Sequence, residues 1–539
     1  MIKYIKKYFS KFKKTIIFLS ILIIVSGIIS LIIPSFIGKF IDLLIYEDDI
    51  KIIRKKIYIF SVLLIVNIIN SYLVSIVTAK IQTRLCFSIS FDIIEHLKKI
   101  PYLEIIKYDP LYLNRRINTD SNVLVLFFLD NYLNFFFKFI TLIFSFYILC
   151  NIDITIAIIL LFFVPAYILL YILLKNKYYK LNLKYKESQD HFFVRLTEQI
   201  TNIKTIKIDS SFESYKTKVI SSFDDMFKKL IDFSRISYIT SGLDSVLSSI
   251  ANILIFFVGG IKVINKELSI GEFTVITTYF NIIMTSISYY LNIGKSFQDC
   301  KSSFLRIQEL LSIDKENNGN KFINTIDEIN LKKISFKYNN KFIFNNFSFC
   351  FKVGNIYCIK GHNGVGKSTL LNIIMGLITQ MNEGSVSYNQ SDIQELDLYK
   401  IRKEFFSVVS QDYILKDVEL EKILNNINEE NLKANSANRD SNCINTYNFF
   451  IKKINVECSQ NESNILSGGE NQKLSIFKAL SKNSKVLIMD EPTSSLDSTS
   501  ISVLRKILLD LKKDKIIILV SHDKHLENIC DICIDLNHV

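Results

Sequence analysis

The sequence contains no tryptophan and no regular cysteine framework. The missing tryptophan accompanies a richness in Ile, Lys and Asn, a compositional bias that excludes no function. The nine cysteines are odd in number and follow no repeating spacing, which argues against a disulfide scaffold and fits a reducing compartment for the soluble part. Cys530 and Cys533 form a lone C-x-x-C, which predicts buried strand cysteines rather than a metal or redox site because no second pair accompanies it.

Two further absences narrow the class of protein. The formal charge of +13 could indicate a nucleic-acid partner, but the sequence has no basic and aromatic module with RNA-binding spacing, so none is expected. The Lys-rich N-terminus precedes an apolar run over residues 16–33, as in a signal peptide, yet no A-x-A-like cleavage site follows. We therefore predict a retained first membrane helix with its N-terminus inside.

Apolar side chains are abundant. The 539 residues should form more than one domain, and 49% hydrophobic residues with a mean hydropathy of +0.26 favour a membrane protein in contact with lipid. Six apolar segments each reach the ~20 residues that a membrane-spanning helix needs. They cover residues 16–45, 57–79, 131–150, 152–174, 240–264 and 273–297.

The distribution of basic residues predicts the topology of these six spans. An even number places both termini on one side, which the Lys-rich start makes the cytoplasm. The long connections 80–130 and 175–239 are rich in Lys and Arg and are expected inside, whereas the short links near 152 and 266 are expected outside. One loop argues against this topology, because residues 46–56 should lie outside yet contain four basic residues.

After residue 325 the composition changes to short apolar strands alternating with amphipathic helices, the α/β pattern. The segment 312–325 is polar and linker-like. The predicted fold class is therefore an α-helical polytopic membrane domain over 1–311, a linker over 312–325, and an α/β domain over 326–539.

A phosphate-binding loop is predicted in the α/β domain. The apolar run 356–359 stops before Gly361, and a glycine-rich loop leads into the helix-like 370–375, which gives G-x-x-x-x-G-K-[ST] between a strand and a helix. Glycines let backbone N–H groups close around phosphate oxygens, and the helix N-terminus adds partial positive charge. A chance glycine-rich turn, the alternative, would need none of these flanking elements. The residues assigned to phosphate binding are Gly361, Asn363, Gly364, Gly366, Lys367, Ser368 and Thr369.

Polar residues that follow other predicted strands complete the chemistry of phosphoryl transfer. The strand-like run 485–489 ends in Asp490, which can hold Mg²⁺ through water, and Glu491, which can polarise a water attacking the γ-phosphate. Gln411 can touch Mg²⁺ and that water, and His522 can contact the γ-phosphate. Any one of these residues, taken alone, would more simply have a structural role. Their assignment to phosphoryl transfer therefore depends on the predicted phosphate loop.

A second anion site is predicted in Leu-Ser-Gly-Gly-Glu, residues 466–470. Ser467, Gly468 and Gly469 offer a hydroxyl and backbone N–H groups at the start of a helix near Asn471. A plain Ser/Gly helix cap is the alternative.

These motifs together resemble the ATP-binding cassette (ABC) family, and their order covers the whole α/β half. The resemblance makes 466–470 the signature loop, Ser495-Leu496-Asp497 the D-loop and His522 the switch histidine. Tyr338 is similar to the aromatic residue that stacks on adenine. The resemblance implies ATP and Mg²⁺ as cofactors. The implied metal residues are Ser368, Gln411 and Asp490, and the implied catalytic residues are Glu491, His522, Lys367 and Gln411.

The membrane half resembles the six-helix exporter branch of this family. Pro34, Gly38 and Asp42 are similar to that branch's first-helix end, and residues 269–273 to the entry into its sixth helix. The resemblance implies a half-transporter that pairs with a second copy or a similar chain. Each ATP would then lie between one chain's phosphate loop and the partner's signature loop.

The resemblance implies ATP-driven export across the cytoplasmic membrane. The elbows near 105–114 and 204–214 would be its coupling helices. The substrate could be a bacteriocin-like peptide, a drug or a lipid. A membrane-bound regulatory ATPase or ATP-gated channel could share every motif, whereas a soluble phosphate-loop kinase would leave six spans unexplained.

Three features bear on the details of this resemblance. Glu470 replaces the family's common Gln, a variant that the family also uses, and residues 457–463 lack the glycines that many exporters carry before the signature. These departures leave details of coupling open. No peptidase-like domain precedes the first span, so leader cleavage by this chain is not expected.

Overall fold

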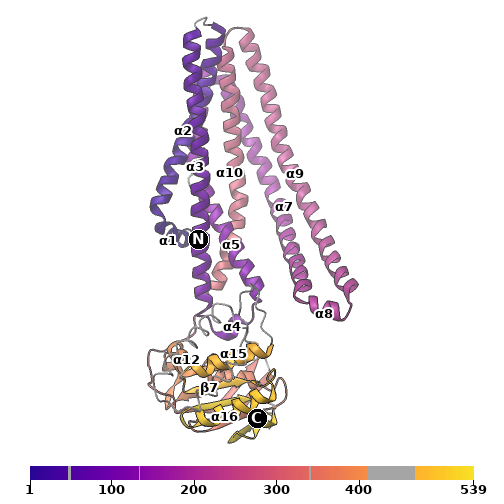
Figure 1. The fold of residues 1–539 in the computed structure, drawn as a ribbon. Helices are drawn as coiled ribbons and strands as arrows, with labels where there is room; N and C mark the ends of the chain where they lie inside the picture. Colours follow the sequence, from indigo (N-terminus) through magenta and orange to yellow (C-terminus); the bar gives the residue numbers. More distant parts are fainter. Residues whose placement is uncertain are drawn as a thin grey trace. The chain divides into compact units, whose positions relative to one another are not determined.

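The computed structural model describes residues 1–46, 50–132, 134–338, 341–410, 468–482, 484–521 and 523–538. The chain forms two compact units (Figure 1), each of which is described by itself. The first comprises Met1–Lys98 and Asp109–Ile313. The second comprises Lys99–Tyr108 and Asp314–Val539.

The first unit is built from long helices. Among the described residues, six stretches are long and apolar enough to cross a membrane, which confirms the six predicted spans. The 48 residues of α7 extend ~72 Å at ~1.5 Å per residue, more than twice the ~30 Å hydrocarbon core, so α7 continues well beyond it. The helices are α1 (Ile2–Lys11), α2 (Lys13–Tyr46), α3 (Ile50–Leu97), α5 (Pro110–Tyr132), α6 (Asn134–Ile152), α7 (Ile154–Thr201), α8 (Ile203–Ile208), α9 (Phe212–Ile264) and α10 (Ile270–Leu311).

The residues that resemble the exporter branch meet at the ends of α2 and α10. The Asp42 carboxylate accepts hydrogen bonds from the Gly271 backbone N–H (2.7 Å) and the Ser269 hydroxyl (2.8 Å). Ser269 also forms a capping box with Glu272 at the start of α10. A Cβ at Gly271 would lie 2.1 Å from the Gly38 carbonyl oxygen, so only glycine permits this approach. The motif is therefore a contact between the first and last spans.

Two ion pairs join α5 to α10 within the same unit. Arg306 binds the fully buried Asp120, and the buried Arg116 binds Glu309. Because each buried charge has a partner of opposite sign, the cost of removing it from water is offset.

The described part of the second unit contains two sheets. A parallel sheet has the order β6-β7-β8-β3-β9, and an antiparallel sheet has the order β2-β1-β4-β5. β3, β7 and β8 are almost continuously buried apolar runs, as expected for parallel strands covered on both faces. The strands are β1 (Glu328–Tyr338), β2 (Lys341–Lys352), β3 (Ile356–Lys360), β4 (Glu383–Tyr388), β5 (Ser391–Asp392), β6 (Phe406–Val409), β7 (Val486–Asp490), β8 (Ile516–Val520) and β9 (Ile532–Asp535).

The helices of this unit connect the strands. The helix that follows the phosphate loop packs its apolar residues into the core shared with β3 and β8. The helices are α4 (Tyr102–Ile105), α11 (Lys367–Ile374), α12 (Leu398–Phe405), α15 (Gly468–Ser481), α16 (Ser498–Leu511) and α17 (Lys524–Glu527).

The short helix α4 belongs to the second unit. Its Leu103 packs against the apolar core of the unit, and the nearby Lys99 carbonyl accepts a hydrogen bond from the Glu316 N–H (2.7 Å). The helix lies N-terminal to the elbow expected at 105–114, because Pro101 precedes α4 and Pro110 starts α5. The polar segment predicted as a linker is part of this unit from Asp314 onward.

Candidate nucleotide-binding site

The predicted site residues follow adjacent strands of the parallel sheet. In the sheet register, Val520 at the end of β8 is opposite both Ile359 of β3 and Asp490 of β7. The phosphate loop after β3 and the carboxylate that ends β7 therefore lie at one edge of the sheet, where ligands bind in open α/β folds. Three predicted residues, Gln411, Ser467 and His522, lie outside the described residues.

The phosphate loop depends on glycine at three positions. Gly361, Gly364 and Gly366 have φ angles of 149°, 84° and 114°, which L side chains rarely adopt. A Cβ at Gly366 would lie 2.4 Å from Ile343 Cγ2 on β2, whereas a Cβ at Gly364 would meet nothing within 4 Å. The loop is thus packed against β2 at Gly366 and open at Gly364.

Side chains hold this loop in shape. Lys367 Nζ donates a hydrogen bond to the Gly361 carbonyl (2.7 Å), which closes the loop on itself. The Asn537 Oδ1 accepts a hydrogen bond from the His362 backbone N–H (2.9 Å), so the end of the chain supports the loop. Sequence reasoning missed Asn537, since no local pattern connects it with a loop 175 residues earlier.

The residues of the first turn of α11 suit a nucleotide and its metal. Ser368 is exposed and Thr369 is buried in that turn. Among the described residues, no group of three His, Cys, Asp or Glu could hold a metal ion. Mg²⁺ with a nucleotide needs no such group, because one carboxylate, a hydroxyl, phosphates and waters suffice. Ser368 and Asp490 therefore fit the expected metal chemistry.

Glu491 lies in a sharp turn directly after β7. Its φ angle is 49°, a left-handed conformation that costs energy for a residue other than glycine. Its backbone N–H donates a hydrogen bond to the Val520 carbonyl at the end of β8 (2.8 Å). Such local strain is typical of functional sites, where the surrounding structure holds a residue in an unfavourable conformation.

The helix α15 holds this turn by hydrogen bonds from near its N-terminus. Gln472 Nε2 donates to the Glu491 carbonyl (2.9 Å) and to the Ser494 hydroxyl (3.1 Å), and its Oε1 accepts from the Ser495 N–H (2.8 Å). Lys473 forms an ion pair with Asp497 (3.0 Å). Neither residue was predicted from the sequence, although their position two and three residues after the predicted signature loop was a usable signal.

Three predicted residues of this region remain, and two of them make close contacts. A Cβ at Gly469 would lie 2.8 Å from the Ser495 carbonyl oxygen, so glycine lets α15 approach the D-loop. Asp497 precedes α16 and accepts hydrogen bonds from the Thr499 and Ser500 hydroxyls. Gly468 is the first residue of α15.

Tyr338 ends β1 on the hairpin with β2. Its side chain is partly exposed and packs edge-on against Phe336, with ring centroids 5.0 Å apart. The same hairpin supplies Ile343 and Phe344, whose side chains lie against Gly366. The aromatic ring is therefore carried by the element that covers the phosphate loop.

Charge and thiols surround the end of β3. Lys360 pairs with Glu527 (2.8 Å), and this hydrogen bond raises the pKa of Lys360.

The prediction of buried strand cysteines for the C-x-x-C was wrong, because Cys533 is exposed on β9 and Cys530, before β9, is only partly buried. β9 is the edge strand of its sheet, so it has a neighbouring strand on one side only. The apolar pattern of the sequence did not reveal this edge position.

Comparisons with known proteins cover both units. The family model of the ABC transporter transmembrane region matches residues 16–287, just over half of the chain, and the ABC transporter model matches residues 344–494.

Curated relatives include transporters of two kinds. The chain is 28% identical over 425 residues to the lacticin-481/lactococcin-DR transport/processing ATP-binding protein of Lactococcus lactis subsp. lactis, covering 77% of this chain and 58% of that protein. It is 25% identical over 385 residues to the lactococcin-G-processing and transport ATP-binding protein of the same organism, covering 70% and 54%. It is 26% identical over 289 residues to the ATP-dependent lipid A-core flippase of Vibrio parahaemolyticus serotype O3:K6, covering 51% and 48%.

The chain spans about half the length of the curated relatives it matches. The six apolar helices and the matched transmembrane region make it a multi-pass membrane protein. The chain belongs to the ABC transporter family, in which it carries a six-helix transmembrane region followed by one ATP-binding domain.

Proposed function

We propose that this chain is an ATP-driven exporter that works as a dimer, with a second copy or a similar chain. The observation that carries the proposal is the covalent fusion of six spanning helices to a sheet edge that presents a phosphate loop and the Asp490-Glu491 pair. A soluble ATPase would have no need for the spans. A peptide is supported as substrate by the printed names of two relatives, and a lipid by that of a third.

The residues at the sheet edge have complementary roles in hydrolysis. Tyr338 stacks on adenine, and Lys367 binds the β- and γ-phosphates while the loop glycines supply backbone N–H groups. Glu491, positioned by its strained turn, polarises the attacking water. Ser368, Asp490 and Gln411 would hold Mg²⁺, which would neutralise charge on the phosphates, and His522 would contact the γ-phosphate.

The partner chain completes each site in this proposal. Ser467, Gly468 and Gly469 of one chain bind the nucleotide held by the other chain's phosphate loop, and Asp497 lies in the D-loop between them. The tip of the α7–α9 pair supports pairing, because large apolar side chains there are more than half exposed. They are Ile200, Ile203, Ile208 and Phe212.

The proposed orientation places both termini and the ATP-binding domain in the cytoplasm and the spans in the cell membrane. The Lys-rich α1 and the basic extensions of α7 and α9 support it through the positive-inside rule. Closure of two ATP-binding domains on ATP then moves the spanning helices, and hydrolysis resets them.

The test uses the purified full chain in lipid vesicles with its ATP-binding domain outward. We expect ATPase activity that a transported compound stimulates, and ATP-dependent accumulation of that compound inside. Glu491→Gln should still bind ATP, while phosphate release falls at least 100-fold, about 2.7 kcal/mol of barrier. Normal phosphate release from this variant would refute the role of Glu491. An ATP-dependent ion current without accumulation would overturn export in favour of a channel.

A further inference from the structure

Three cysteine side chains meet at the end of the parallel sheet that carries the phosphate loop. Cys358 lies on β3, the strand that leads into this loop, and Cys533 lies on the neighbouring strand β9. The parallel register places these two residues opposite each other. Cys530 comes just before β9. The sequence shows a lone C-x-x-C, and the fold brings a third thiol to it from a strand about 170 residues earlier.

The three side chains lie on the same face of the sheet. Successive residues of β3 and β8 alternate between two apolar clusters, which therefore occupy opposite faces. Ile356 of β3 belongs to the cluster against which Cys530 packs, so Cys358, two residues later, points to that face. Ile534 of β9 belongs to the other cluster, so the preceding Cys533 points to the face of Cys358 as well.

The thiols differ in access and in reactivity. Cys533 is exposed, Cys530 is partly buried, and Cys358 is fully buried. The Cys530 proton is shared between the Leu526 carbonyl (3.2 Å) and the Cys358 sulfur. This hydrogen bond, helped by Lys360, lowers the pKa of Cys358 in spite of its burial, whereas burial raises the pKa of Cys533. Since the thiolate is the nucleophile in disulfide exchange, an accessible thiol lies beside an inner one that is ready to attack it.

The spacing of the strands permits a bond between Cys358 and Cys533. The Cα atoms of opposite residues on neighbouring strands are about 4.8 Å apart, which is within the range of about 4.4–6.8 Å found in disulfides. A disulfide holds its two Cβ atoms only about 3.8 Å apart, so its formation draws β9 toward β3. β9 can follow, because it is the edge strand and has no neighbouring strand on its other side.

A movement of β9 reaches the phosphate loop. Two residues after this strand, Asn537 Oδ1 accepts the hydrogen bond from the His362 backbone N–H (2.9 Å). Cys533 is only four residues before Asn537. Because a hydrogen bond weakens steeply when its partners lose their alignment, displacement of β9 deprives the loop of this support.

We propose that Cys358, Cys530 and Cys533 form a thiol–disulfide exchange site for low-molecular-weight disulfides, and that its closure weakens ATP binding at the phosphate loop. The Cys533 thiolate first attacks the disulfide RSSR, bonds to one sulfur and displaces RS⁻. The Cys358 thiolate then attacks the Cys533 sulfur, forms the Cys358–Cys533 bond and displaces the second RS⁻. Both leaving thiolates take up the protons that the two cysteines lose, so two cysteines are oxidised while RSSR is reduced to two RSH. Only the effect on ATP rests on the function proposed above.

The chemistry is tested on the full chain in lipid vesicles without nucleotide. The reduced chain is incubated with oxidised glutathione, blocked with N-ethylmaleimide, digested and mapped by mass spectrometry. We expect a cross-link between Cys358 and Cys533 that dithiothreitol reverses. Cys533→Ser should abolish it, and Cys530→Ala should slow its formation at least fivefold. The matched control Cys350→Ser, at a partly buried thiol of β2 in the same unit, should stay within twofold of the wild type.

Three results would overturn the exchange site. They are a glutathione adduct on Cys533 that never closes, a disulfide between Cys530 and Cys533, and no reaction at these cysteines.

The effect on the loop is measured on the cross-linked and the reduced chain. Equilibrium titration should show ATP affinity at least fivefold lower after cross-linking, with recovery in dithiothreitol. Amide hydrogen exchange of the peptide that contains His362 should be faster in the cross-linked chain, a readout that needs no ATP. Cys533→Ser, with its folding checked by the thermal midpoint, should show neither change. Unchanged exchange or unchanged affinity in the cross-linked wild type would overturn the coupling to the loop. A reduced chain that forms the cross-link but binds no ATP would instead refute the proposed nucleotide site.

Discussion

Replacing Gln472 by Met should separate ATP hydrolysis from ATP binding. Met has a similar length and shape but makes none of the three hydrogen bonds that hold residues 491–495. These bonds join α15 to the turn that positions Glu491, whereas Tyr338 and Lys367 lie on other elements. The substitution should therefore loosen Glu491, the residue proposed to polarise water, and leave the proposed nucleotide contacts in place.

The expected magnitude follows from the hydrogen bonds lost. Each contributes about 0.5–1.5 kcal/mol, so the three together stabilise the turn by about 1.5–4.5 kcal/mol. If the lower value appears in the barrier of the chemical step, kcat falls by about tenfold. KM for ATP should change by less than about twofold, because a mutation that acts only on the transition state lowers kcat and kcat/KM together.

The assay is phosphate release by the full chain in lipid vesicles over a range of ATP concentrations. The exposed Gln394 of the same unit, changed to Met, is the matched control and should keep kcat within twofold. The thermal midpoint and the stoichiometry of ATP binding show whether the variant is folded. A kcat within twofold of the wild type in a folded Gln472→Met variant would refute the inference that this side chain positions the catalytic turn.

Three further outcomes are expected. Gly366→Ala should abolish ATP binding, measured by equilibrium titration, because φ is 114° and the new Cβ would lie 2.4 Å from Ile343 Cγ2; retained affinity would contradict the loop geometry. Ile208→Asp, at the exposed tip of the α7–α9 pair, should reduce substrate stimulation of the ATPase at least fivefold with basal activity kept, and unchanged stimulation would argue against docking of this tip. Burial raises the pKa of Asp531, but hydrogen bonds from the Ile356 N–H and from Lys512 outweigh it, so the net pKa is lowered. A carboxyl group whose pKa is lower in the folded state stabilises the protein at pH values above its unfolded pKa of about 3.9. This stabilisation is lost as the pH falls through the folded pKa. The thermal midpoint of Asp531→Asn should therefore be lower than the wild type's between pH 5 and 8, with a difference that shrinks below about pH 4; a constant difference would contradict the ion pair.

The loop and strand ends of the candidate site could be predicted because their patterns are local. The phosphate loop needs glycines with positive φ, a preceding strand and a following helix, and all of these fall within twenty consecutive residues. The same holds for Asp490, which ends a buried apolar run. The six spans are local as well, because membrane thickness sets a length that a single apolar segment must satisfy.

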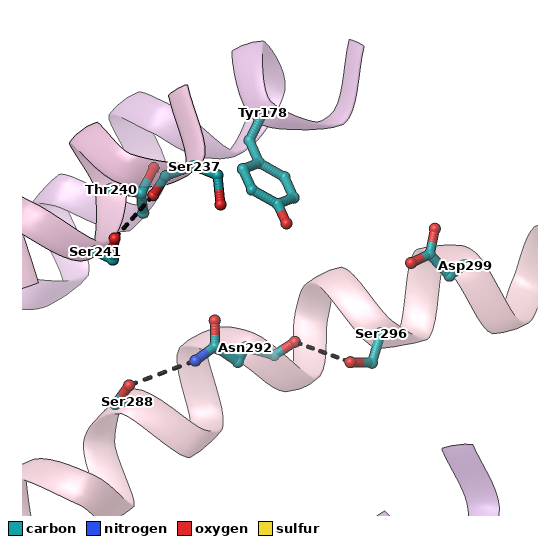
Figure 2. A pocket seen from close by; sticks show the side chains of 8 residues that line it. All are labelled: Tyr178, Ser237, Thr240, Ser241, Ser288, Asn292, Ser296 and Asp299. Atoms are coloured by element: carbon teal, nitrogen blue, oxygen red, sulfur yellow. Dashed lines mark hydrogen bonds between the residues drawn. The ribbon is translucent and has the colours of Figure 1, made fainter. Parts of the chain in front are cut away.

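The contacts that complete the molecule join segments that are far apart in the chain, and the sequence alone could not pair them. Asp42 meets Gly271 across 229 positions, and Asn537 supports a loop 175 positions earlier. A polar cavity lined by Tyr178, Ser241 and Asn292 (Figure 2) exists only because α7, α9 and α10 meet there. Thus the sequence by itself determined the family's motifs, the six spans and the form of the glycine-rich loop, since these depend on spacing along the chain. The tertiary structure decided the hydrogen bonds between Gln472 and residues 491–495, the exposure of Cys533 and the polar cavity between α7, α9 and α10, since these depend on packing between segments that no spacing connects.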